Sequence, residues 1–183
     1  MGTVANERVV PETAAYRFGM LMFLVTQGVP FILIWAVAYA FDGFYVSPQL
    51  NQWVGGIEAV LLLLSGIYAS QGVSAIKNGD LPTLLGRFKT TIILGIADLA
   101  VTAYQWGTRF TPPGTRFGEI YYTLSGVSGF YTLVAVLGMA AITLRAARIQ
   151  LTRHNYWDAE AIKYFWNFQV LTGLVTYIIL YWL

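Results

Sequence analysis

The chain has 183 residues, of which 57% are hydrophobic and only 11% are charged, and its mean hydropathy is +0.59. These values lie outside the range of an ordinary soluble domain and indicate an integral membrane protein. The absence of cysteine excludes a disulfide, an iron–sulfur cluster and a thiolate metal site. Loop residues carry the net charge of +2, so we expect no nucleic-acid partner.

Five long apolar stretches divide the chain. They cover about residues 18–41, 53–76, 90–106, 120–146 and 161–183. A helix needs about 20 apolar residues to cross a bilayer, so each stretch is close to the required length. We therefore predict an all-α fold, with a single domain of five transmembrane helices over residues 18–183. The polar segment 1–17 leads into a stretch too long for the core of a signal peptide, so we expect no cleavage.

The lysine and arginine residues favour alternate gaps between these stretches. Nine of them occupy the N-terminal segment and the second and fourth gaps: Arg8, Arg17, Lys77, Arg87, Lys89, Arg145, Arg148, Arg153 and Lys163. The other side has only Arg109 and Arg116. Short cytoplasmic loops carry the excess of positive residues. The pattern predicts a cytoplasmic N-terminus and an external C-terminus.

Local signals refine the ends of the stretches. Gly79 suits the end of one helix and Asp80 the start of the next, whereas Asp158 and Glu160 favour the positive end of a helix dipole. Aromatic residues near the ends are typical of membrane-interface belts: Phe41, Phe44, Tyr45, Trp53, Trp106, Tyr121, Tyr122, Tyr177, Tyr181 and Trp182. Small residues in the middle stretches favour close helix packing: Gly66, Ser70, Gly95, Ala97, Ser125, Gly126 and Gly129.

Four polar residues inside the stretches are candidate functional positions, because ionisable groups are costly within a membrane and usually have a role there. Asp98 is either a protonated carboxyl that hydrogen-bonds to a neighbouring helix or a proton-carrying site. Glu58 lies one turn into its helix, where placement near the helix end explains it. Gln27 and Gln105 are expected to hydrogen-bond between helices. Asp98 and Gln105 are seven residues apart, so they share one helix face, which should point to protein.

The sequence offers no catalytic, cofactor-binding or metal-binding residues of its own. Its only histidine, His154, lies in a predicted cytoplasmic loop, and a haem pair or copper site in the membrane needs several. We interpret His154 as a solvated loop residue, the alternative being surface proton collection. No Gly-rich phosphate loop or nucleophile motif is present.

Several stretches, read in order, resemble subunit III of haem–copper terminal oxidases. Residues 18–27 (FGMLMFLVTQ) look like its "GM-x-x-F-x-x-S-E" helix, and 57–66 (IEAVLLLLSG) are similar to its "N/E-T-x-L-L-L-x-S-S/G" helix. Residues 94–106 follow an "L-G … Q-A-x-E-Y" pattern, and 117–131 a "Y/F-G-S-x-F-F … T-G-x-H-G-L-H" pattern. Residues 160–182 match "E-A-A-A-W-Y-W-H-F … I-Y-W-W". The resemblance covers nearly everything after the N-terminal segment, and the order of the motifs is more specific than any one of them.

The departures from this pattern concern its polar residues. Gln27 stands at the place of the family's carbodiimide-reactive glutamate, and Gln105 at that of a second glutamate. The remaining changes replace three histidines and an aspartate with Ser128, Tyr131, Asn167 and Val170. The resemblance therefore points to a divergent branch.

The resemblance implies a non-catalytic subunit of a respiratory terminal oxidase, in aerobic electron transport with oxygen reduction. It would pack on the haem- and copper-bearing subunit I and other subunits, and support oxygen delivery or turnover. Structural phospholipid would lie in a cleft between helices one–two and three–five, with headgroups near Arg17 or Arg87. Five spans fit the shorter form of quinol oxidases, in a bacterial or archaeal cell membrane.

Two other functions stay open. One is the related accessory subunit of a nitric oxide reductase. The other, of a different class, is a small independent transporter or channel. A transporter would favour an inverted repeat or paired broken helices around a midplane site, and the sequence shows neither.

Overall fold

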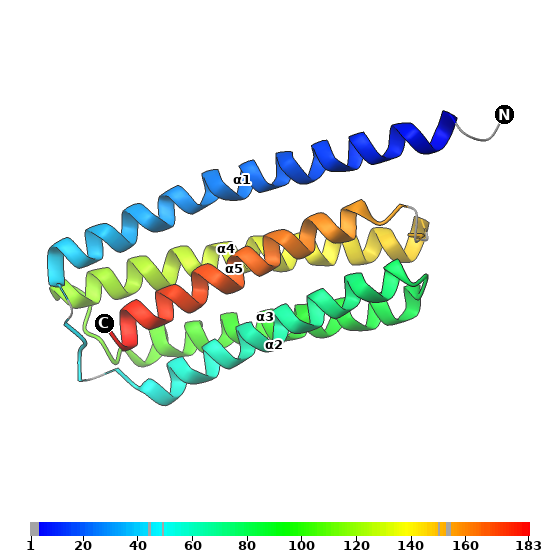
Figure 1. Cartoon of the computed structure of the whole chain (residues 1–183). Helices are drawn as coiled ribbons and strands as arrows, with labels where there is room; N and C mark the ends of the chain where they lie inside the picture. Colours follow the sequence, from blue (N-terminus) through cyan, green and yellow to red (C-terminus); the bar gives the residue numbers. More distant parts are fainter. Residues whose placement is uncertain (1–3, 44, 49, 150, 153–154) are drawn as a thin grey trace.

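Five helices make up the structure, which is a computed structural model (Figure 1). It describes residues 4–43, 45–48, 50–149, 151–152 and 155–183, with side chains from residue 14 onward except that of Ile149. The helices are α1 (Val4–Asp42), α2 (Gln52–Lys77), α3 (Leu81–Thr108), α4 (Arg116–Ile149) and α5 (Trp157–Tyr181). These described residues contain no β-strand, so the all-α prediction is confirmed. Phe44, Arg153 and His154, which the sequence analysis singled out, lie outside the described residues, as does the side chain of Arg8.

Three helical segments are long and apolar enough to cross a membrane: Ala14–Asp42, Gln52–Lys77 and Arg116–Arg148. Helices α3 and α5 have 28 and 25 residues, which exceeds the roughly 20 that a span needs. However, α3 carries Asp98 and two basic residues, and α5 carries charges in its first turns, which lowers their hydropathy. The structure thus shows a membrane protein, and five spans stay a prediction.

Some helix ends differ from the apolar stretches. Helix α1 extends back to Val4, and α3 begins at Leu81, well before the apolar stretch that starts near residue 90. The reason at α3 is capping: Asp80 accepts a 3.0 Å hydrogen bond from the backbone N–H of Thr83, as predicted. Gly79, just after α2, has a φ of 86°, which glycine adopts without strain.

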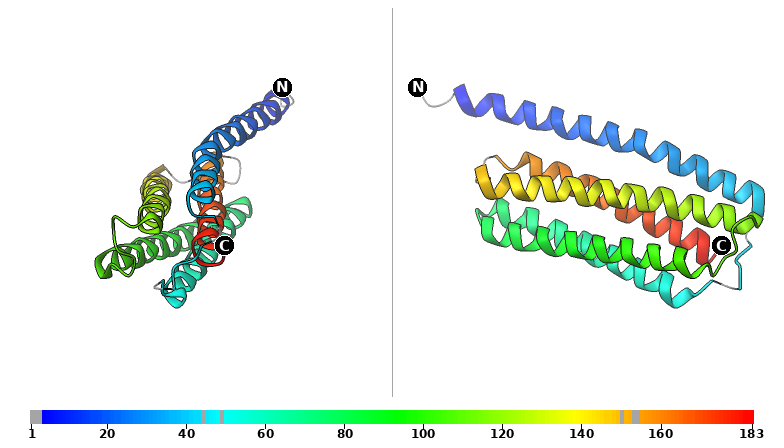
Figure 2. Two further views of the ribbon diagram at one scale, coloured as in Figure 1. Left: turned by 90° about the vertical axis from the view of Figure 1, so that its left-hand side faces the viewer. Right: turned by 180° about the vertical axis from the view of Figure 1, so that it is seen from behind.

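Helices α2, α3, α4 and α5 form a four-helix bundle, and α1 lies to one side of it (Figures 1 and 2). Helix α2 packs on α3 and α5, whereas α1 contacts only α4 and α5. The predicted cleft between helices one–two and three–five is therefore wrong. The close pairing of α2 with α3 follows from small residues at their contact: Gly72 lies against Phe88, and an added Cβ there would be 2.9 Å from its ring.

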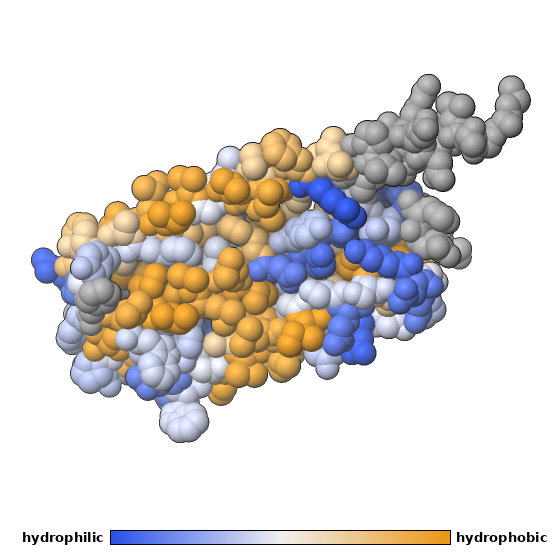
Figure 3. Space-filling model, viewed as in Figure 1, coloured by the Kyte–Doolittle hydropathy of each residue, from blue (hydrophilic) through white to orange (hydrophobic). Residues whose placement is uncertain are grey.

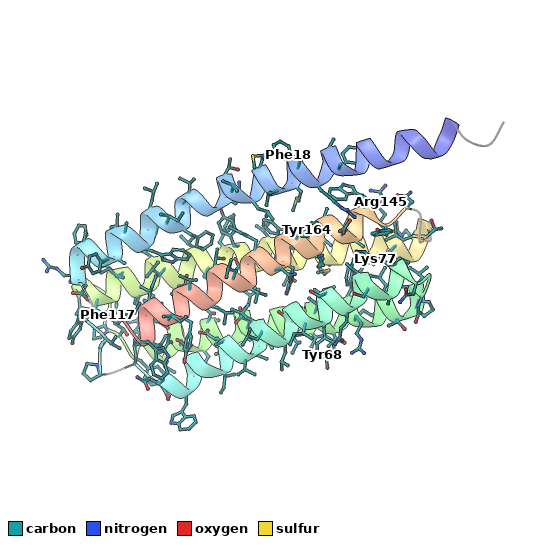
Figure 4. All side chains as sticks on the ribbon, viewed as in Figure 1. Phe18, Tyr68, Lys77, Phe117, Arg145 and Tyr164 are labelled. Carbon is teal, nitrogen blue, oxygen red and sulfur yellow. The ribbon has the colours of Figure 1, made fainter. Side chains whose placement is uncertain are left out.

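Charged residues gather at one end of the bundle. That end holds the α2–α3 turn and the α4–α5 connection, and we call it the turn end; the opposite end, with the α3–α4 loop, is the loop end (Figure 1). In Figure 3 apolar residues cover much of the visible face, and hydrophilic ones collect toward the turn end. Lys77 and Arg145 lie there, whereas Phe117 lies at the loop end (Figure 4).

Two apolar clusters fill the described interior. The larger lies toward the turn end and includes Val73, Phe88, Met139 and Trp166. The smaller lies toward the loop end, around Phe117 and Leu124. Buried polar residues separate the two, and they form the candidate site.

Candidate functional site

A small cavity of about 40 Å³ lies between the four helices of the bundle. Glu58 lines it from α2, Asp98 and Thr102 from α3, Tyr121 from α4 and Tyr181 from α5. All four helices therefore contribute a polar side chain to one interior space. We call these five residues together with Gln105, Thr132 and Gln169 the polar cluster.

Asp98 is a buried acidic residue in the middle of α3, with 5% of its surface exposed. Its carboxyl interacts with the hydroxyl of Thr132 on α4 and lies close enough to Glu58 for electrostatic repulsion. Gln105, two turns along α3, is 4% exposed. The predicted helix face shared by Asp98 and Gln105 thus does point to protein.

Glu58 faces α3, where its Oε1 accepts a 2.8 Å hydrogen bond from the hydroxyl of Thr102. It is half-buried and lines the same cavity as Asp98. A place near a helix end was the explanation expected for Glu58. That placement alone does not account for its hydrogen bond with Thr102. Thr102 follows Asp98 by four residues, so one face of α3 presents both groups to α2.

Gln105 links three helices, as expected for an interhelical hydrogen-bonding residue. Its Oε1 accepts hydrogen bonds from the hydroxyls of Tyr121 on α4 and Tyr181 on α5, the latter at 2.8 Å. Its Nε2 has no hydrogen-bond partner among the described residues, and the amide lies beside the Glu58 carboxyl. The amide thus joins the tyrosine pair to the carboxyl pair.

Tyr121 and Tyr181 correct part of the predicted aromatic belt. Both are buried, with 4% and 3% of their surface exposed, because their hydroxyls reach inward to Gln105. Trp53 and Trp182 are 86% and 65% exposed, which agrees with a place at the outer surface. Proximity to a helix end does not tell whether an aromatic side chain points into the bundle or toward the outer surface.

Gln169 is a member of the polar cluster that sequence analysis missed. It is 1% exposed, and its Nε2 donates a 2.8 Å hydrogen bond to the Thr132 hydroxyl. The same nitrogen lies 3.0 Å from the carbonyl oxygen of Ser128. An uncharged amide in the middle of the apolar stretch 161–183, two residues after Asn167, is the signal that could have revealed it.

A second buried hydrogen bond lies nearer the turn end. The Nε1 of Trp166, a residue 1% exposed, donates to the Ser65 hydroxyl at 2.9 Å. The indole fits because Gly95 leaves room for it: a Cβ on Gly95 would lie 2.6 Å from Trp166. This confirms the predicted close approach of helices at Gly95.

Gln27 lies apart from the polar cluster, on α1. Its Oε1 accepts a 2.9 Å hydrogen bond from Tyr131 of α4, which confirms the expected interhelical bond. Asn167 of α5 donates to the Ser70 hydroxyl of α2 at 3.3 Å. These contacts tie the outer sides of the helices together.

At the turn end, Glu160 is a buried carboxyl between positive groups. It is 2% exposed and forms ion pairs with Arg17 of α1 at 3.0 Å and Lys77 of α2 at 3.5 Å. Burial alone would raise the pKa of Glu160, but the hydrogen bonds and charges of Arg17 and Lys77 outweigh it and hold that pKa below its ordinary value. Tyr164, one turn along α5, donates to the same carboxyl.

The two predicted lipid-headgroup residues have protein contacts of their own. Arg17 binds Glu160, and its side chain remains 46% exposed. Arg87 is half-buried, and its guanidinium lies 5.1 Å from the ring centre of Tyr68. The structure thus brings Asp98, Glu58 and Gln105 together, and it leaves Gln27, Arg17 and Arg87 elsewhere.

The polar cluster can hold protons and water, because it consists of carboxyl, hydroxyl and amide groups. Within the described part of the chain, no group of three histidine, cysteine, aspartate or glutamate residues is placed to hold a metal ion. The fold and the polar cluster define a helical membrane protein whose apolar interior contains a group of buried polar residues.

Several known proteins similar to this chain share one name. The cytochrome c oxidase subunit 3 of Chondrus crispus is 24% identical over 186 residues, covering 91% of this chain and 66% of that protein. Those of Anopheles gambiae and Cyprinus carpio are 24% and 23% identical, each covering 99% of this chain and 74% of the relative. No family model matches the chain.

The resemblance inferred from the motifs is therefore confirmed at low identity. The chain is a distant homologue of proteins named cytochrome c oxidase subunit 3, and it aligns with them along most of its length. Its alignment spans about two thirds of the first relative and three quarters of the others.

Proposed function

We propose that the chain is a divergent, non-catalytic subunit III of a respiratory haem–copper terminal oxidase. The observation that carries the proposal is the alignment of 91–99% of the chain with proteins named cytochrome c oxidase subunit 3. Haem and copper would then belong to the partner, subunit I. The role of this chain would be to pack on that subunit and to support oxygen delivery or sustained turnover.

We further propose five membrane spans, with the turn end in the cytoplasm and the C-terminus outside. The turn end contains Lys77, Arg87, Lys89, Arg145 and Lys163, whereas Arg109 and Arg116 lie at the loop end. This grouping supports the orientation, because positive residues favour the cytoplasmic side. The short form of the family suggests the plasma membrane of a bacterium or archaeon, although the relatives above are eukaryotic.

Lipid is the proposed occupant of an apolar groove along α2 and α5. Near the loop end it is lined by Trp53, Val60 and Trp182, and farther along by Ile67 and Leu171. Helix α1 does not contact α2, so this flank is open. Acyl chains would fill the groove, with headgroups near the exposed parts of Arg17 or Arg87.

The alternatives have less support. The alignment names an oxidase subunit, and nothing favours the nitric oxide reductase accessory subunit over it. A transporter of the broken-helix type would interrupt helices near the midplane. Helices α2 to α5 run without a break through the described residues.

Purification of the tagged chain from its native membrane in mild detergent tests the proposal. A much larger haem-containing polypeptide should co-purify, seen by its haem spectrum and by mass spectrometry. Recovery of a colourless, stable chain without such a partner would contradict the oxidase role.

A further inference from the structure

We propose that Glu58 and Asp98 form a proton-binding site in which the two carboxyls and water between them share protons. This goes beyond the role in an oxidase and does not depend on it. It rests on the geometry of the polar cluster.

Among its described lining residues, the cavity has no positive charge to balance the two carboxyls. The titratable groups lining the cavity are Glu58 of α2, Asp98 of α3, Tyr121 of α4, and Tyr177 and Tyr181 of α5. No lysine, arginine or histidine occurs among these lining residues in the described structure. Two ionised carboxylates in an apolar interior repel one another and lose their hydration, so the pair retains at least one proton.

The cavity supplies room for a bridging molecule. Its free volume of about 40 Å³ exceeds the ~10–15 Å³ of free space that one water needs. A buried water also needs two to four polar partners. Besides Glu58 and Asp98, the polar residues Ser128 and Thr176 line the cavity, so such partners are present.

Gln105 provides an independent sign of a missing partner. This residue is 4% exposed, yet its Nε2 has no hydrogen-bond partner within the described structure, although the amide lies beside Glu58. A buried N–H group without a partner is costly and rare. Water beside Glu58 would accept this hydrogen bond.

Infrared spectroscopy of the full chain in lipid vesicles tests the shared proton. At neutral pH the wild type should show the C=O stretch of a protonated carboxyl, shifted in D₂O. The double variant Glu58→Gln, Asp98→Asn should lose this band, and Glu119→Gln, which changes an exposed carboxyl at the loop end, should keep it. In Glu58→Gln alone, Asp98 has lost its repelling neighbour, so its band should disappear at a lower pH than in the wild type.

Three outcomes would overturn the proposal. The first is the absence of the band from the wild type at neutral pH. This measurement does not depend on the folding of any variant. The second is a band that survives in the double variant. The third is a band whose pH dependence shifts with sodium concentration, which would identify a metal-cation site instead.

Discussion

Gln27 on α1 and Tyr131 on α4 form a hydrogen bond of 2.9 Å where α1 packs against the bundle. By resemblance, the family has a glutamate and a histidine at these two positions. Here both are replaced by uncharged groups, and the two side chains still contact one another. Two departures from the family pattern therefore meet in one uncharged link between α1 and α4.

This link should contribute to the docking of α1. Tyr131→Phe removes only the hydroxyl and keeps the ring contacts with Phe31 and Phe168. We expect a loss of about 0.6 kcal/mol in stability, the average for a hydrogen bond between membrane helices. Denaturation in detergent, followed by circular dichroism, measures it.

A double-mutant cycle provides the control for that prediction. Once Gln27 is changed to Leu, the additional change Tyr131→Phe should have almost no further effect. Additive effects of the two substitutions would show that the hydrogen bond does not couple the helices.

The Glu160 carboxyl should make stability depend on pH at the acid side. Its pKa in the folded chain lies below the ordinary value of 4.5 because of Arg17 and Lys77. The stabilisation is therefore complete above pH 4.5 and is lost as the pH falls through the folded pKa. The wild type should have a higher Tm than Glu160→Gln at neutral pH, and the two should converge on acidification.

The matched control for Glu160 is Asp158 on the same helix. Asp158 pairs with Arg145 at 2.9 Å, but its side chain is 31% exposed and that of Arg145 57%. Exposed ion pairs contribute little, so Asp158→Asn should change Tm far less. A larger effect at Asp158 would contradict the importance given to burial.

Gly95 and Gly86 offer a matched pair on α3 for testing the packing. An added Cβ on Gly95 would lie 2.6 Å from Trp166 and 2.8 Å from Val136, whereas one on Gly86 meets nothing within 4 Å. We expect Gly95→Ala to cost about 1–3 kcal/mol by over-packing, and Gly86→Ala to be neutral or slightly stabilising. Trp fluorescence should shift only for Gly95→Ala. Equal stability of the two variants would disprove the close approach.

Asp98 should tolerate an amide better than an apolar side chain. Asparagine keeps a polar group against Thr132, whereas leucine takes away the partner that Asp98 offers to the buried Thr132 hydroxyl. Asp98→Asn should therefore assemble as the wild type does, and Asp98→Leu should be less stable by about 1–2 kcal/mol, as for polar contacts between membrane helices. Size-exclusion profiles after mild heating distinguish them, and normal behaviour of Asp98→Leu would exclude a structural role.

Sequence patterns predicted the helices better than the contacts between them. The length of the apolar stretches located all five helices. The seven-residue spacing of Asp98 and Gln105 placed both on the side of the helix that faces protein. The position of α1 could not be predicted, because apolar faces that meet lipid and those that meet protein have the same composition. The inward orientation of Tyr121 and Tyr181 could not be predicted either, because it depends on Gln105 of another helix.

Glu58 shows the limit most clearly within the candidate site. Its place near a helix end predicted a peripheral residue, but rotation about the α2 axis turns its carboxyl toward Thr102. That rotation is set by the packing of α2 against α3 and α5. No local signal in the sequence reports it.

The number of spans and their orientation can be tested with single cysteines, because the chain has none of its own. Asn78→Cys and Thr108→Cys mark the two ends of α3, and Thr152→Cys and Leu183→Cys mark those of α5, all at exposed positions. Helices α3 and α5 are the two that do not qualify as spans by hydropathy alone, so they decide the count. We expect a membrane-impermeant maleimide to label Thr108→Cys and Leu183→Cys in intact cells, and the other two only after permeabilisation. The reverse pattern would invert the proposed orientation, and labelling of both ends of either helix from one side would show that this helix does not cross the membrane.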